Sequence, residues 1–210
     1  VVQEDVKAWL EAQPDGSLPS LMAGIPDLAE MDLMAGKNVH LRISKVDEYK
    51  KWFSSIAKLC FRKVSNRAFV CFFQTDRSLS RLNPARRISK FGLIQAVAEQ
   101  VGIPLLWHKI VTPGVNKMAQ PGRPTFSHCF LYSFNSSAGS ATADVIDQGS
   151  KSWANATPES AVDVFLTTVA KSTSPIPPGV VDLFAGYGTV AIAALRRGMS
   201  NVFAVEIDDA

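Results

Sequence analysis

The stretch Val180–Ala210, VVDLFAGYGTVAIAALRRGMSNVFAVEIDDA, decides the fold. An apolar run leads into a turn with glycines at 186 and 188. An alanine-rich segment follows, and a second apolar run ends at Glu206. This order is typical of a strand, a helix and a second strand. Such a unit usually opens a nucleotide-binding domain, whereas here it comes last in the chain.

Helix and strand patterns alternate along the rest of the sequence. Apolar runs predict strands at Val1–Val2, Leu18–Ala23, Ala68–Phe73, 103–111 and 125–134. Apolar residues at helical spacing predict a helix that Asp5 caps and that carries Val6, Trp9 and Leu10 on one face. They also predict helices at 48–64, at 87–102, where Gly102 ends the helix, and at 157–172, which Thr157 caps and which buries a face from Ala161 to Val169. The alternation predicts an α/β fold with a mainly parallel sheet and helices on both faces.

Composition sets wide limits on function. The 210 residues are 47% hydrophobic and 20% charged, which suits one globular domain, and the net charge of +3 is only weak evidence for an anionic partner. The three cysteines lie far apart and form no metal-binding pattern, so we expect buried thiols and an intracellular, reducing location. No apolar run is long enough to span a membrane, and no signal peptide is visible. Because the chain starts without Met and ends directly after a strand, we expect a piece of a longer protein.

The glycine turn allows three interpretations. Residues 186–191, GYGTVA, formally satisfy the dinucleotide-binding pattern, in which a helix N-terminus holds a pyrophosphate. An acid at Asp182 would repel a pyrophosphate, but it favours the sulfonium and ammonium charges of S-adenosylmethionine (SAM). Glu206 ends the second strand, where a carboxylate can accept both hydroxyls of a ribose. A plain turn without a ligand is the third interpretation.

The segment DLFAGYGT, followed by VEID, resembles motif I and the ribose-binding acid of the SAM-dependent DNA amino-methyltransferases, which modify adenine N6 or cytosine N4. The family usually reads DPFxGxGT, and Leu183 replaces its proline. The resemblance implies a Rossmann-like class I methyltransferase fold with a seven-stranded type of sheet, and SAM as the cofactor. One subgroup, the beta type, is circularly permuted, with its SAM-binding unit last in the chain. That order accounts for the position of Val180–Ala210. It also implies that Val180–Leu183 is a central strand, parallel to the strand that ends at Glu206 and to the one that ends near Ala23.

The resemblance covers nearly the whole chain. It implies one domain, with residues 1–135 as the catalytic and substrate half and residues 150–210 as the SAM-binding half. The chain departs from the family at Cys129, where Glu is usual, at His108 before Lys109, and in lacking the lysine that commonly precedes the proline at 158. The residues implied to hold SAM are Asp5, Asn155, Thr157, Asp182, Phe184, Ala185, Gly186, Gly188, Thr189 and Glu206.

The largest departure lies at the family's catalytic tetrapeptide, (Asp/Asn/Ser)-Pro-Pro-(Tyr/Phe). The aligned residues are Gly24, Ile25, Pro26 and Asp27, of which only the second proline matches. In the family the first side chain accepts hydrogen bonds from the target amino group, and the aromatic residue stacks on a flipped base. Gly24 has no acceptor side chain, and Asp27 cannot stack. By itself this stretch is typical of a turn after a strand.

Three outcomes stay open. The chain is an active methyltransferase that uses Asp27, Glu30 or Asp32; or it binds SAM as a scaffold or assembly factor without methyl transfer; or it is a relic that binds no SAM. The implied partners are SAM, DNA or RNA, and a partner protein that completes the site, with no membrane association.

Two further groups of residues carry weaker signals. Gln74, Thr75 and Asp76 follow the most apolar strand and either border a cleft or cap a turn, and His108 and His128 fit structural roles. A set of basic residues suits either a phosphate-binding patch or a solvated face, namely Arg77, Arg81, Arg86, Arg87, Lys90, Lys117 and Arg123.

Overall fold

The computed structural model describes residues 1–28, 43–78, 87–114, 124–135, 142–153, 155–171 and 179–207. Within these residues eight strands form one sheet, in the order β1-β10-β9-β2-β3-β7-β6-β8. The sheet strands are β1 (Val2–Gln3), β2 (Ser20–Ala23), β3 (Val70–Gln74), β6 (Leu105–Thr112), β7 (Ser127–Tyr132), β8 (Val145–Asp147), β9 (Gly179–Leu183) and β10 (Asn201–Glu206). A separate short hairpin pairs β4 (Arg77–Ser78) with β5 (Arg87–Ile88).

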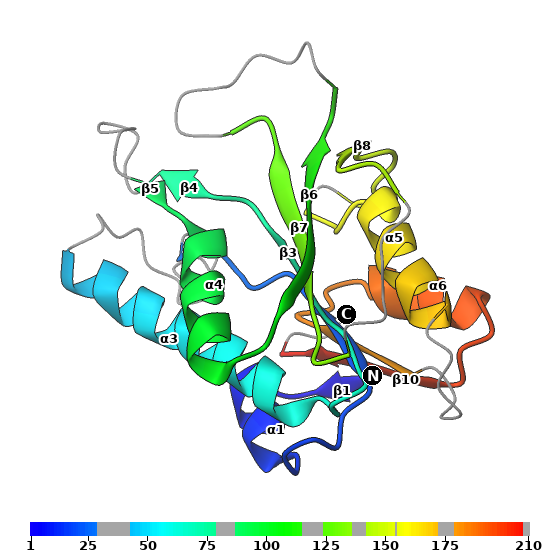
Figure 1. Cartoon of the computed structure of the whole chain (residues 1–210), viewed down its shortest axis with the longest axis horizontal. Coiled ribbons are helices and arrows are strands. Elements are labelled where there is room, and N and C mark those ends of the chain that lie inside the picture. Colours follow the sequence, from blue (N-terminus) through cyan, green and yellow to red (C-terminus); the bar gives the residue numbers. More distant parts are fainter. Residues whose placement is uncertain are drawn as a thin grey trace.

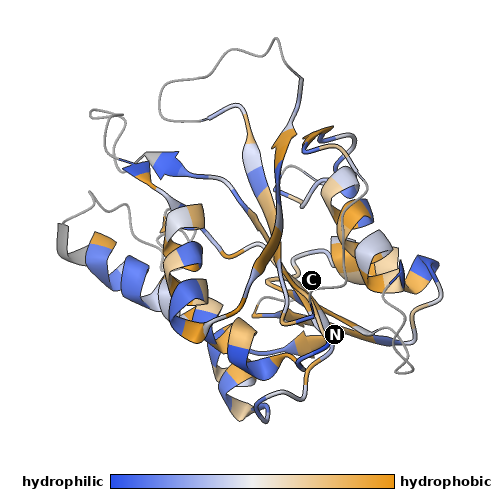
Figure 2. Ribbon diagram, viewed as in Figure 1, coloured by the Kyte–Doolittle hydropathy of each residue, from blue (hydrophilic) through white to orange (hydrophobic). Residues whose placement is uncertain are grey.

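Helices cover both faces of the sheet (Figure 1). One face packs against α1 (Val6–Ala12), α3 (Ile43–Lys63) and α4 (Lys90–Val101). The other packs against α5 (Glu159–Lys171) and α6 (Thr189–Arg196). Alternate strand residues serve the two cores, so Leu21 and Val70 face one helix layer while Met22 and Cys71 face the other. β2 and β9, in the middle of the sheet, are therefore buried at every position. Figure 2 shows hydrophobic residues, in orange, on the strands where they cross the middle of the molecule.

The last strand–helix–strand unit lies inside the sheet. β9 pairs in parallel with β10 on one side and with β2 on the other, with Asp182 opposite both Ala204 and Met22. This confirms the central, parallel position expected for Val180–Leu183. Parallel pairing also brings the carboxyl ends of β9, β10, β2 and β3 to one edge, where ligands of open α/β sheets bind.

Most predicted elements are present. The prediction for one strand is wrong in part, and one further strand, β8, was not predicted. The apolar run at Ala68–Phe73 predicts a central parallel strand, but β3 is parallel only to β2 and antiparallel to β7. Burial on both faces makes a strand apolar whichever way its neighbour runs. The sequence gives no sign of β8, because its residues are mostly exposed and the polar linker around it has no hydrophobic period.

The three cysteines of the sequence all lie in described segments and are buried and free. The Sγ atoms of Cys71 and Cys129 are 3.7 Å apart between β3 and β7. Burial raises the pKa of the Cys71 thiol well above its usual range. Among the described residues, no helix combines the length and apolarity that crossing a membrane requires.

We predict that Phe72→Ala lowers the free energy of unfolding by about 3–5 kcal/mol, because it removes a fully buried ring and leaves a cavity. The Phe72 ring lies 5.7 Å from Phe61, 5.8 Å from Phe130 and 6.4 Å from Tyr132, centre to centre. Urea denaturation of the purified protein measures the change. The matched control is Phe203→Ala on β10, where the ring is 40% exposed and the loss should stay below about 1 kcal/mol. Equal losses in the two variants would contradict this placement of the core.

Candidate functional site

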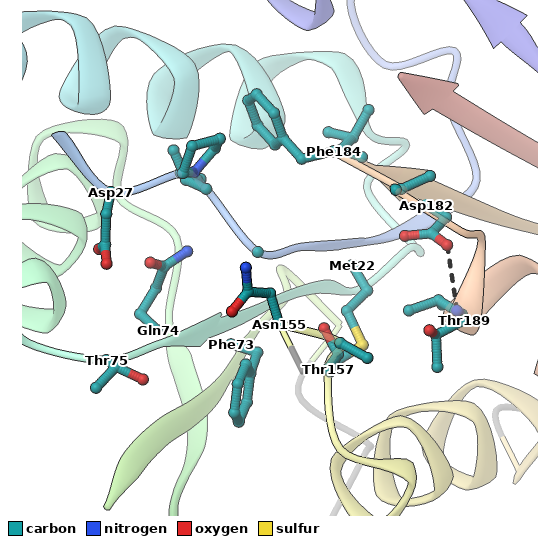
Figure 3. Close-up of a pocket in the computed structure, with 18 of the residues that line it drawn as sticks. Met22, Asp27, Phe73, Gln74, Thr75, Asn155, Thr157, Asp182, Phe184 and Thr189 are labelled. Atoms are coloured by element: carbon teal, nitrogen blue, oxygen red, sulfur yellow. Dashed lines mark hydrogen bonds between the residues drawn. The ribbon is translucent and has the colours of Figure 1, made fainter. Parts of the chain in front are cut away.

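One cavity of about 780 Å³ opens at the carboxyl ends of β9, β10, β2 and β3 (Figure 3). One end of it is formed by the glycine turn after β9, and the other by the segment after β2 together with the end of β3. With the exception of Gly188, every residue proposed from the sequence for SAM or for the catalytic tetrapeptide lines this cavity, namely Asp5, Gly24, Ile25, Pro26, Asp27, Asn155, Thr157, Asp182, Phe184, Ala185, Gly186, Thr189 and Glu206.

The glycine turn needs the residue types that it has. Gly186 and Gly188 both have positive φ, +50° and +71°, which L side chains rarely adopt. A Cβ on Gly186 would also lie 2.9 Å from the Trp153 ring. Gly188 is the N-cap of α6 and shapes the turn from outside the cavity. The backbone of the turn therefore lines the cavity, and the indole ring of Trp153 packs directly on Gly186.

Asp182 ties β9 to the start of α6. Its Oδ2 accepts hydrogen bonds from the backbone N–H groups of Val190 (3.2 Å) and Ala191 (3.1 Å). Burial raises the pKa of Asp182 to about 7, because desolvation of the carboxylate outweighs these two bonds, and the nearby Glu206 charge adds to the rise. The carboxyl group therefore changes charge close to neutral pH. A cation entering the cavity would favour its ionised form.

Glu206 lies at the end of β10 and is bound to the same turn. Its Oε2 accepts from the Gly186 N–H at 2.7 Å, and its Oε1 accepts from the Ile207 N–H at 2.9 Å. A carboxylate has about four acceptor positions, so it can hold these bonds and still accept the hydroxyls of a diol. Asp182 and Glu206 together give this end of the cavity two carboxyl groups.

Three predicted SAM residues line the cavity from other segments. Asp5 caps α1 through its Oδ1, which accepts from the Ala8 N–H at 3.0 Å. Thr157 lies across from the glycine after β2, with its Oγ1 3.8 Å from the position that a Cβ on Gly24 would take. Figure 3 shows Asn155 between Thr157 and Gln74. In the same figure, Asn155 and Thr157 lie between Asp27 at one end of the cavity and Asp182 at the other.

The segment after β2 ends in a buried ion network. The Pro26 carbonyl accepts a hydrogen bond from the Tyr49 hydroxyl at 2.9 Å, which fixes the segment on α3. Asp27 is only 6% exposed, and its two carboxylate oxygens pair with Arg77 Nε and Lys90 Nζ. The charged side chain at this position is therefore held between two cations. The other two carboxylates considered above, Glu30 and Asp32, lie outside the described residues.

Gln74 and Thr75 line the cavity beside this network, whereas Asp76 is not among the lining residues. The Asp76 Oδ1 accepts from the Lys90 N–H at the start of α4 (2.8 Å). Gln74 is 2% exposed, and its Nε2 has no hydrogen-bond partner among the described residues. The Thr75 hydroxyl lies 2.6 Å from the Ser127 hydroxyl.

Some cavity residues gave no signal in the sequence. Trp153 packs on Gly186, and its buried Nε1 has no partner among the described residues. Lys90 belongs by sequence to a basic surface cluster, but it is 3% exposed and paired with Asp27. Lys90 comes from a segment far from the glycine turn in sequence, and only the tertiary fold brings it to the cavity, whereas Trp153 lies two residues before Asn155. Of the remaining basic residues, Arg81, Arg86, Lys117 and Arg123 lie outside the described residues.

The two strand histidines form a cluster apart from the cavity lining. His108 Nε2 and His128 Nδ1 are 2.9 Å apart, and the Phe91 ring stacks on His108 at 4.4 Å. His128 also lies 3.7 Å from the Asp76 carboxylate. Burial, and then the neighbouring His128, hold the pKa of His108 below its usual value. The packing agrees with the structural role expected for this pair.

No protein-family model matches the chain, and no curated protein matches it in sequence. Solved structures do match its fold. PvuII DNA methyltransferase, described as cytosine-N4-specific, has a TM-score of 0.67 and 18% identity, over 98% of this chain and 80% of that one. A putative DNA modification methylase from Thermus thermophilus, complexed with S-adenosyl-L-methionine, has a TM-score of 0.65 and 14% identity, over 99% and 88%.

A third structure, the M1.HpyAVI–SAM complex, has a TM-score of 0.54 and 11% identity, over 99% of this chain and 92% of that one. Identities this low establish the architecture alone. The chain therefore has the mixed α/β, Rossmann-like fold of these methyltransferases.

Proposed function

We propose that the chain is a SAM-dependent methyltransferase that acts on an amino group of a nucleic acid. The observation that carries the proposal is the continuous cavity that joins the carboxyl groups of Asp182 and Glu206 to the segment of Gly24–Asp27. The similarity in fold to DNA methylases, two of them solved with SAM, supports the same function.

The residues at the glycine turn fit SAM. Glu206 would accept the ribose hydroxyls, and the carboxylate of Asp182 would attract the positive charges of the methionine end. Gly186 keeps the backbone open for close approach, and Trp153 brings an unpaired N–H to the same place. Bound SAM would supply an electrophilic methyl group. The role of this chain is to hold that group and exclude water around it.

The order of the elements supports a permuted arrangement. β9, α6 and β10 come last in the sequence, yet β9 lies beside β2, which comes near the start. We propose that residues 1–135 form the acceptor-binding half and residues 150–210 the SAM-binding half, as in a circularly permuted methyltransferase. The network of Asp27 with Arg77 and Lys90 takes the place of the aromatic residue that would stack on a flipped base.

We predict that SAM binds more tightly as the pH rises through about 7, while the affinity for S-adenosylhomocysteine changes less. The pKa of Asp182 is about 7 in the folded chain, so the carboxyl group is neutral below that pH and charged above it. Only SAM carries the sulfonium charge that the ionised form attracts. Titration calorimetry at pH 6 and pH 8 measures both ligands.

The matched variant is Asp182→Asn, which keeps an acceptor for the α6 N–H groups but cannot ionise. It should bind SAM about tenfold more weakly at pH 8, since a charge-assisted contact contributes about 1.5–3 kcal/mol. Its SAM affinity should also lose the pH dependence. If NADH binds and SAM does not, the proposed function is wrong.

We predict that this chain alone transfers no measurable methyl group to unmodified duplex DNA, although it binds SAM. Gly24 offers no side-chain acceptor, and Asp27 offers no ring on which an extruded base could stack. The assay follows labelled methyl from SAM to duplex DNA, single-stranded DNA, RNA and protein. Asp27→Asn is run in parallel, with its unfolding transition measured, because the change leaves Arg77 and Lys90 without their buried partner.

If the proposed function is correct, the labelled methyl group is transferred to a single-stranded nucleic acid. SAM binding without transfer to any substrate would favour the scaffold or assembly-factor alternative. Strong transfer to duplex DNA that is unaffected by Asp27→Asn would show that the catalytic segment lies elsewhere.

A further inference from the structure

We propose that Gln74 is the acceptor-binding residue of this cavity, and that its carboxamide pairs with the amino-bearing edge of an unpaired adenine or cytosine. The inference rests on the proposed function, because it names the group that the same cavity receives. The carboxamide would accept a hydrogen bond from the target amino group, which Gly24 cannot do because it has no side chain.

The first observation is an unpaired polar group. Gln74 is 2% exposed and lines the cavity, and its Nε2 has no hydrogen-bond partner among the described residues. Burying an amide without a partner destabilises the folded state, because the group loses its hydrogen bonds to water. Buried polar groups in folded proteins nearly always have partners, so a ligand is the natural partner here.

The second observation is position. β2 and β3 are parallel, with Ala23 opposite Phe72, so Gly24 continues the chain beside Phe73, and β3 ends one residue later at Gln74. A Cβ on Gly24 would lie 4.0 Å from the Phe73 carbonyl oxygen. In Figure 3 the Gln74 amide points into the space between Asp27 and Asn155, toward the segment that follows β2. A side chain from the neighbouring strand thus reaches the place where an acceptor is missing.

The third observation is the charge around Gln74. Asp27 pairs with Arg77 and Lys90, and the backbone of Lys90 binds Asp76. These two carboxylates and two cations balance one another, so this end of the cavity favours a neutral ligand. The polar group that it presents is a carboxamide, which both donates and accepts hydrogen bonds.

The chemistry that matches is an amino group next to a ring nitrogen. Adenine presents N6 beside N1 or N7, and cytosine presents N4 beside N3. The Oε1 of Gln74 would accept a hydrogen from the amino group while Nε2 donates to the ring nitrogen, the two-point contact that Gln makes with adenine elsewhere. Holding the amino hydrogen in this way directs the nitrogen lone pair, which is what a methyl acceptor needs.

The experiment measures binding rather than turnover. The protein is saturated with S-adenosylhomocysteine and titrated with single-stranded oligonucleotides that carry one central adenine or one central purine, which has the same ring system without the amino group. Cytosine and 2-pyrimidinone form the second matched pair. We expect the amino-bearing base to bind about tenfold more tightly in each pair that fits, and Gln74→Leu to bring that ratio close to one.

Controls separate this role from a structural one. Gln74→Leu removes an unpaired buried amide and keeps its volume, so the free energy of unfolding should stay equal or rise. The affinity for S-adenosylhomocysteine should also stay unchanged in this variant. Gln100→Leu makes the same substitution on the exposed face of α4 and should leave every ratio as in the original chain.

Three results would overturn the inference. One is that the unmodified chain binds S-adenosylhomocysteine but binds the amino-bearing base and its analogue equally well. That result would leave the proposed cofactor site intact. Another is a tenfold ratio that survives Gln74→Leu. The third is that a glutamine-containing peptide binds more tightly than either oligonucleotide and that this binding depends on Gln74. That result would indicate that the cavity receives a protein acceptor. Failure to bind S-adenosylhomocysteine or SAM at all would instead overturn the proposed function.

Discussion

The carboxylate of Asp182 connects the sheet to the helix on which the site depends. Asp182 lies one residue before the end of β9, and its carboxylate accepts hydrogen bonds from the N–H groups of Val190 and Ala191 in the first turn of α6, so the strand and the helix are joined at the turn. Four N–H groups at a helix start have no partner within the helix, and an acid there also interacts favourably with the helix dipole. The cost is a buried charge, which the raised pKa reflects. The glycine turn keeps its shape because both of its ends are held in this way, the second by Glu206 through Gly186.

The cavity divides into two chemical environments. At the turn, two carboxyl groups lie close together, and the charge of Glu206 contributes to the raised pKa of Asp182. At the far end, the charges of Asp27, Arg77 and Lys90 pair among themselves and leave a neutral amide facing the space. A ligand with positive charge and a ribose suits the first end, and a flat neutral group suits the second. The two environments differ because the ends of β9 and β10 carry the carboxyl groups of Asp182 and Glu206, whereas the end of β3 carries the carboxamide of Gln74.

The sequence predicted local features well because their causes are local. The Asp5 cap, the Gly102 C-cap of α4 and the buried face of α5 from Ala161 to Val169 all follow from neighbours within a few residues. The central place of β9 was predicted from the resemblance and is confirmed by its two parallel partners. The ion network of Asp27 left no local sign, because its cations are 50 and 63 positions away in the chain. For Gln74 the sequence offered a cleft or a turn as alternatives, and a glutamine at the end of an apolar run carries no sign of its burial.

Because all three thiols are buried, the rate at which they react with a labelling reagent reports how often the folded chain opens. Cys60, Cys71 and Cys129 are each buried, and desolvation disfavours the reactive thiolate of Cys60 and Cys71. Labelling of the native protein must therefore wait for transient exposure of the sheet, and its rate follows the free energy of that opening. Two of the three sulfurs lie between β3 and β7, beneath the strand that carries Gln74. A ligand that tightens this strand would slow modification of these sulfurs, so occupancy becomes readable by mass spectrometry without any attached probe.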